Sequence, residues 1–72
     1  MKLYSNLSGN SGIYAYEIGL NFIRVKFIDS SIYTYSFESA GAFHVEHMKA
    51  LAIRGFGLNS YINKYVKKLY AR

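Results

Sequence analysis

Residues 22–37, FIRVKFIDSSIYTYSF, decide the fold, because they predict two strands joined by a tight turn. In the first half, the basic residues Arg24 and Lys26 alternate with branched and aromatic residues. This period of two is typical of a strand that buries one face. Residues 29–31 (DSS) form a turn signal, and residues 32–37 (IYTYSF) are rich in side chains that favour strands. The stretch therefore predicts an antiparallel hairpin.

A third strand is expected before the hairpin. Residues 13–18 (IYAYEI) are aromatic and branched, and residues 19–21 (GLN) supply the turn that follows them. Short turns between successive strands predict a meander. Residues 1–12 are rich in Ser, Asn and Gly without periodicity, so we expect a flexible N-terminal arm there. The single domain is expected over residues 13–72.

The hydrophobic period changes after the third strand. Apolar residues recur three and four positions apart over residues 42–54, which predicts an amphipathic helix. Ser39 is expected to cap its start and Gly55 to end it. A second helix is expected from Asn59 or Ser60 onward. Its expected buried face consists of Tyr61, Ile62, Tyr65, Val66 and Leu69.

These elements together predict the fold class. We expect an α+β domain in which a three-stranded antiparallel meander is followed by two helices packed on one face, in the order β-β-β-α-α. A chain of 72 residues has room for one such domain. Eight Tyr and five Phe supply large side chains for its small core.

Two short motifs that follow one another along the chain carry a resemblance to a known family. The first is Tyr33-Thr34-Tyr35 with the strand and turn before it, and the second is residues 57–62 (GLNSYI), which open the last helix. The chain resembles the KTSC domain, a small module found alone in bacterial and phage proteins and at the C-terminus of some lysyl-tRNA synthetases. The resemblance covers roughly residues 11–70. It implies a domain with no established activity and, because of the synthetase fusion, a role in binding RNA.

The charge of the chain is positive and uneven. Nine Lys and Arg stand against four Asp and Glu, for a net charge of +5, and no acid follows Glu46. Such a distribution favours an acidic partner, which could be nucleic acid, an anionic membrane surface or an acidic protein. The alternative interpretation is that the charge serves only solubility.

The turn of the hairpin leaves two interpretations of Tyr33 and Tyr35 open. A two-residue turn pairs Lys26 with Tyr33 and Arg24 with Tyr35, which puts the tyrosines and the cations on one face. Such a face could stack on unpaired bases and bind phosphates, as sheet-based RNA-binding proteins do. A three-residue turn shifts the pairing by one and places both tyrosines in the core with Val25, because a one-residue slip reverses every side chain.

The expected last helix carries a second basic feature. Its cations, Lys64, Lys67, Lys68 and Arg72, lie on or near one exposed face. Such a stripe could follow phosphates, or it could be an ordinary solvated helix face. Binding to a membrane surface is disfavoured, because the apolar face of this helix is needed to cover the sheet.

Catalytic and metal-binding patterns are weak in this sequence. His44 and His47 are three apart on the expected first helix, but a metal site needs three or four protein ligands. Residues 55–57 (GFG) lack the Gly-Lys-Ser/Thr of a phosphate loop. The chain has no Cys and no set of residues resembling a catalytic triad, so we expect neither an enzyme nor a metal or cofactor.

The sequence therefore predicts a small, non-enzymatic binding module for nucleic acid, with RNA favoured. The residues expected to contact nucleic acid are Arg24, Lys26, Tyr33, Tyr35, Lys64, Lys67, Lys68 and Arg72. The alternative is a protein-interaction module, such as a small phage or mobile-element protein that binds an acidic host or defence protein. A homodimer is a further expectation for so small and tyrosine-rich a chain. The lack of Cys and of a signal peptide favours a cytoplasmic location without membrane association.

Overall fold

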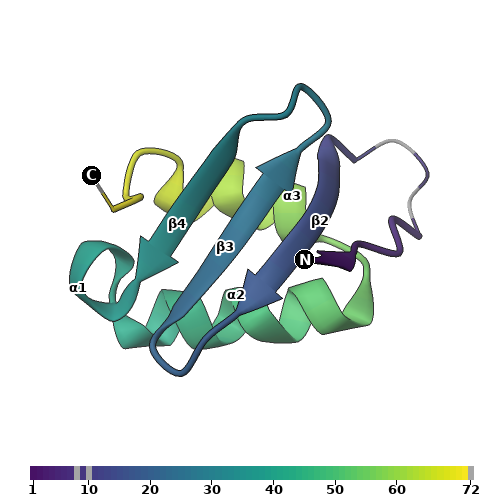
Figure 1. Ribbon diagram of the computed structural model, residues 1–72. Helices are drawn as coiled ribbons and strands as arrows, with labels where there is room; N and C mark the ends of the chain where they lie inside the picture. Colours follow the sequence, from purple (N-terminus) through teal and green to yellow (C-terminus); the bar gives the residue numbers. More distant parts are fainter. Residues whose placement is uncertain (8, 10, 72) are drawn as a thin grey trace.

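The computed structural model describes residues 1–7, 9 and 11–71. It is an α+β structure with a four-stranded antiparallel sheet in the order β1-β2-β3-β4. The strands are β1 (Lys2–Leu3), β2 (Ile13–Ile18), β3 (Phe22–Phe27) and β4 (Ile32–Ser36). The helices are α1 (Phe37–Ala40), α2 (Ala42–Arg54), α3 (Leu58–Tyr61) and the π-helical segment η1 (Ile62–Val66). α2, α3 and η1 lie behind the sheet in Figure 1, so the sheet face turned to the viewer is open.

The expected α+β class is confirmed. The expected three-stranded sheet is wrong, because β1 adds a fourth strand. Lys2 pairs with Tyr16 and Leu3 with Ala15, which adds an edge strand from the segment expected to be an arm. The next residue, Tyr4, is only 6% exposed, and its Oη accepts a hydrogen bond from the Leu58 N–H at 3.3 Å. A two-residue strand is too short to show a period of two, so the sequence pattern could not reveal it.

The β3–β4 hairpin has a three-residue loop. Phe27 N–H donates to the Ser31 carbonyl at 2.8 Å, which leaves residues 28–30 as the loop. Ser30 has φ 74°, the left-handed conformation that closes such loops. Asp29 Oδ1 supports the turn by accepting bonds from the Ser31 N–H at 2.9 Å and the Ser31 hydroxyl at 2.6 Å.

This loop places the two tyrosines of β4 on the helix-covered side of the sheet. Tyr33 pairs with Val25 and Tyr35 with Ile23, both on the core face. The three-residue alternative is therefore the one adopted, although Tyr33 lies opposite Val25 rather than Phe27.

α2 has the expected bounds, Ala42–Arg54, but not the expected cap. Val45, Met48 and Ala52 are its buried residues. The Ser39 prediction is wrong, because Gly41 is the N-cap of α2 and Ser39 lies within the short helix α1. Ser36 caps α1 by accepting a hydrogen bond from the Ser39 N–H, and the Ser36 N–H donates to Ser39 Oγ, both at 3.0 Å.

Gly55 ends α2, as expected. It adopts φ 78°, and a Cβ there would lie 2.6 Å from the Ser5 Cβ. Its carbonyl accepts a hydrogen bond from the Leu7 N–H at 2.8 Å. The end of the helix and the N-terminal segment are therefore packed directly against each other.

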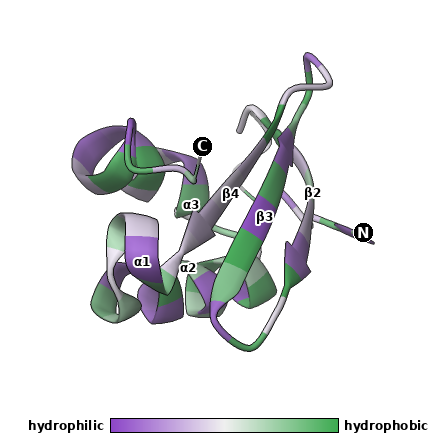
Figure 2. Cartoon of the chain, turned by 60° about the vertical axis from the view of Figure 1, so that its left-hand side comes forward, coloured by the Kyte–Doolittle hydropathy of each residue, from purple (hydrophilic) through white to green (hydrophobic). Residues whose placement is uncertain are grey.

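The C-terminal helix begins at Leu58 and widens into η1. Leu58, Ile62 and Val66, four apart, are buried, whereas Tyr65 and Leu69 are 51% and 41% exposed. The expected buried face is thus wrong for these last two residues. A π-helix bonds residue i to i+5, which changes the face that a given spacing occupies. Figure 2 shows this segment alternating between hydrophobic and hydrophilic residues beside β4.

The C-terminal segment also covers part of the sheet edge. Ala71 N–H donates to the Thr34 carbonyl at 2.6 Å, so one backbone acceptor of the edge strand β4 is paired. No helix in the described part of the chain is long and apolar enough to cross a membrane.

Candidate nucleic-acid interface

The open face of the sheet carries the two strand cations, Arg24 and Lys26. Arg24 Nη1 lies 2.7 Å from Glu17 Oε1, and its Nε donates to Thr34 Oγ1 at 3.1 Å. The guanidinium carbon is 5.0 Å from the centre of the Phe22 ring. Arg24 therefore has partners on β2, β3 and β4.

Lys26 is also paired with an aromatic ring, but not with one that the sequence analysis selected. Its Nζ lies 5.6 Å from the centre of the Tyr14 ring, which is 52% exposed. Tyr14 lies at the irregularity between Ile13 and Ala15, where the pairing of β2 with β3 shifts by one residue. Such a bulge re-aims a side chain, and no period in the sequence indicates it.

The predicted platform of two tyrosines and two cations on one face is wrong. Thr34 lies opposite Arg24, so the tyrosines on either side of it point to the other face of the sheet. Tyr35 is 1% exposed and belongs to the core. Tyr33 is 36% exposed at the margin of the core, where its ring remains accessible.

Tyr33 instead joins the C-terminal helix in a groove. This β4 groove has a volume of about 300 Å³ and lies beside the edge strand. The Tyr33 ring is 4.7 Å from the Tyr70 ring and meets the Phe27 ring edge-on at 5.8 Å, measured between ring centres. The residues that line the β4 groove are Phe27, Tyr33, Tyr35, Ile62, Asn63, Lys67, Lys68 and Tyr70. No carboxylate is among these described residues.

The basic stripe expected on one face of the last helix is wrong, because η1 ends at Val66 and Lys67 and Lys68 lie in the turn that follows it. Lys67 and Lys68 line the β4 groove. Lys64 instead places its Nζ 5.5 Å from the centre of the exposed Tyr65 ring. Arg72, the fourth expected phosphate contact, lies outside the described residues.

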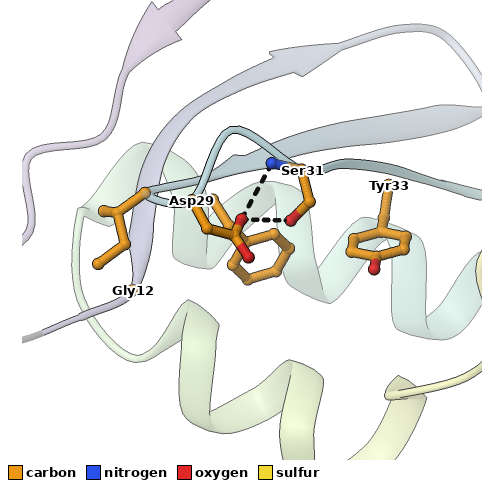
Figure 3. Close-up of a pocket in the computed structure, with 6 residues that line it drawn as sticks. Gly12, Asp29, Ser31 and Tyr33 are labelled. Carbon is orange, nitrogen blue, oxygen red and sulfur yellow. Dashed lines mark hydrogen bonds between the residues drawn. The ribbon is translucent and has the colours of Figure 1, made fainter.

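A second hollow continues from the groove toward the hairpin loop. It has a volume of about 340 Å³ and shares Phe27 and Tyr33 with the β4 groove. Figure 3 shows Asp29 bonded to Ser31 on one side of the hollow and Tyr33 on the other. The hydrogen bonds from Ser31 lower the pKa of the exposed Asp29 carboxyl below its ordinary value.

The hydroxyl of Tyr35 makes the stability of the domain depend on pH in the alkaline range. Burial, with smaller contributions from Tyr33 and Tyr70, raises its pKa from 10.0 to about 12. Folding therefore favours the neutral hydroxyl, and this stabilisation is lost as the pH rises from 10.0 to about 12. We expect the free energy of unfolding to fall less for Tyr35→Phe than for the wild type as the pH rises from 10.0 to about 12, in urea titrations. Equal falls in the two proteins would contradict this assignment.

A cluster of histidines and tyrosines joins α2 to the C-terminal helix. His44 Nδ1 and Tyr61 Oη share a hydrogen bond of 2.6 Å, and the His47 ring stacks on Tyr61 at 4.6 Å. Tyr65 lies 4.7 Å from Tyr61 between ring centres. Burial, and secondly Tyr65, raises the pKa of the Tyr61 hydroxyl. Within the described chain, no three potential ligands gather around a metal position.

Sequence reasoning missed this cluster as a unit. The three-residue spacing of the histidines and the four-residue spacing of the tyrosines each place a pair on one helix face. What neither spacing reveals is that the two faces meet.

Comparisons with protein-family models, with curated proteins and with solved structures found no match for this chain. The resemblance to the KTSC domain therefore stays a prediction that rests on the two motifs quoted above.

Proposed function

We propose that this chain is a non-enzymatic, KTSC-like module that binds single-stranded nucleic acid, with RNA favoured, in the β4 groove. The observation that carries the proposal is the meeting of Tyr33 with Lys67 and Lys68 in a groove without a carboxylate in its described lining. An accessible aromatic ring can stack on an unpaired base, and neighbouring lysines can contact the adjoining phosphates.

The pairing of charges elsewhere supports this choice of site. Arg24 is bonded to Glu17. Lys49 donates to Glu46 Oε2 at 2.7 Å and to the Leu20 carbonyl at 2.9 Å, so it fastens α2 to the β2–β3 turn. Lys67 and Lys68 are exposed and make no ion pair within the described chain. They can therefore exchange their counterions for phosphates without breaking an ion pair.

The open sheet face offers a secondary contact in this proposal. Lys26 and the exposed Tyr14 repeat the combination of a cation and an aromatic ring on that face. The preference for RNA over DNA rests on the resemblance to the KTSC domain. A reducing, cytoplasmic setting is part of the proposal, since the chain contains no Cys.

The proposal is tested by fluorescence anisotropy with a labelled, unstructured single-stranded RNA over a series of salt concentrations. For Lys67→Gln/Lys68→Gln, we expect the slope of log affinity against log salt to become shallower by about 1.4, because two phosphate contacts are lost. The matched control Lys2→Gln/Lys64→Gln removes the same charge away from the groove and should leave the slope nearly unchanged. Equal changes in the two double variants would show that only net charge matters.

The aromatic part of the site is tested separately. Tyr33→Ala should weaken RNA binding by about 1–3 kcal/mol, the usual contribution of one stacked base, while Tyr33→Phe should retain it. Absence of RNA binding by the wild type at low salt would overturn the proposed function.

An alternative proposal is a protein-interaction module that binds an acidic host or defence protein. The observation that favours it is the net charge of +5, with no acidic residue after Glu46. Purification from nuclease-treated lysate with one stoichiometric partner, together with no RNA binding, would support this alternative.

A further inference from the structure

α2 has an exposed face that is as regularly patterned as its buried one. The residues of this α2 outer face recur at intervals of three, four and seven, which aligns them along one side of a helix. Phe43 is 76% exposed and Ile53 is 67% exposed, although both are large and apolar. Figure 2 shows hydrophobic residues recurring along α2. The α2 outer face consists of Phe43, Glu46, His47, Ala50, Ile53 and Arg54.

The apolar surface extends beyond the helix. A hollow of about 570 Å³ lies over Ala50 and Phe43 on this face. A second hollow of about 350 Å³ connects Ile53 with Met1 and Ile18 at the edge of the sheet. Exposed apolar side chains gathered in this way mark an interaction site more often than an ordinary monomer surface.

We propose that the α2 outer face binds the same face of a second copy of this chain, with the two helices antiparallel. Centring the crossing on Ala50 places Glu46 of each copy opposite Arg54 of the other. The same crossing places Ile53 opposite His47. Each contact then occurs twice, as a two-fold interface requires, and the small Ala50 side chains at the centre allow the helices to approach closely.

The charges of the face favour a second copy over other occupants. The face carries one acid and one base, so it has no net charge to attract a nucleic acid or an acidic protein. Arg54 makes no ion pair within the described chain, and the Glu46 side chain is 58% exposed despite its bond to Lys49. Both groups therefore remain accessible to an opposite charge on the partner.

The size of the face predicts a weak dimer. α2 has 13 residues, hence a length of about 20 Å. An interface of this length lies at the low end of specific interfaces, so we expect a weak, reversible dimer. The dimer would leave the β4 groove free, and it does not depend on the proposed RNA binding.

The test uses charge reversal and sedimentation equilibrium across micromolar to millimolar concentrations of the full chain. Glu46→Arg and Arg54→Glu should each weaken self-association at least tenfold, since each brings like charges together. An equimolar mixture of the two single variants should associate at least as tightly as the wild type, because each copy then meets the opposite charge twice. Leu3→Glu, an exposed position on β1, should leave the association unchanged.

Two outcomes would overturn the proposal. One is a wild type that stays monomeric throughout the range of concentrations. The other is a wild-type dimer that both single variants retain, or a mixture that fails to associate, either of which would place the contact on another surface. Far-ultraviolet circular dichroism and unfolding midpoints of the single variants separate lost association from lost folding.

Discussion

Replacing Tyr35 with alanine should lower the free energy of unfolding by about 3–5 kcal/mol, the usual cost of deleting a buried aromatic ring. The Tyr35 side chain is 1% exposed and packs with the sheet and helix residues of the core. A domain of this size has a marginal core, so we expect the variant to be largely unfolded at room temperature. Urea titration followed by circular dichroism measures the loss.

Tyr33→Ala is the matched comparison, because it removes the same side chain two residues away on the same strand face. Tyr33 is 36% exposed, so we expect a loss of about 1 kcal/mol and a folded protein. Together the two variants test the register of the hairpin. In the alternative register both tyrosines would lie on the open face, and both losses would be small.

Gly55→Ala is expected to have the second largest effect on stability. The backbone there has φ 78°, and the new Cβ would lie 2.6 Å from the Ser5 Cβ. The left-handed conformation and the overpacking together should cost about 2–4 kcal/mol. Thermal and urea unfolding of the variant both measure this cost.

Two further variants divide that cost between its causes. Gly57 has the same left-handed backbone, with φ 87° and ψ -4°, and a Cβ built there would meet only Leu51 Cδ2, at 3.9 Å. Gly57→Ala should therefore lose only the backbone contribution, about 1 kcal/mol. Adding Ser5→Gly to Gly55→Ala should recover part of the loss, and no recovery would mean that the Ser5 contact is not a cause.

The regular parts of the fold could be predicted from the sequence. The bounds of α2 follow from its period and from the glycine at its end, and the three longer strands follow from their composition. The hairpin register does not, because Asp29-Ser30-Ser31 suits either turn length. The choice depends on Ser30 adopting φ 74°, which no hydrophobic pattern fixes. The burial of Tyr4 could not be predicted, because a single buried residue produces no hydrophobic period.

The candidate site was predictable in its residue types but not in its arrangement. Tyr33, Lys67 and Lys68 were all selected, yet for two separate surfaces rather than one groove. Their meeting depends on the way η1 places the end of the chain beside β4, and a period of 3.6 does not describe a π-helical turn. Tyr14 was missed because a bulge aims it beside Lys26.

The three-residue loop of the β3–β4 hairpin also limits how this protein can evolve. Gaining or losing one residue there would move every β4 side chain to the opposite face, taking Tyr35 out of the core and Tyr33 out of the groove. Natural variants are therefore free to change the amino acids of the loop, but its length can change only by an even number of residues. An odd insertion would have to be compensated elsewhere in β4 before selection could tolerate it.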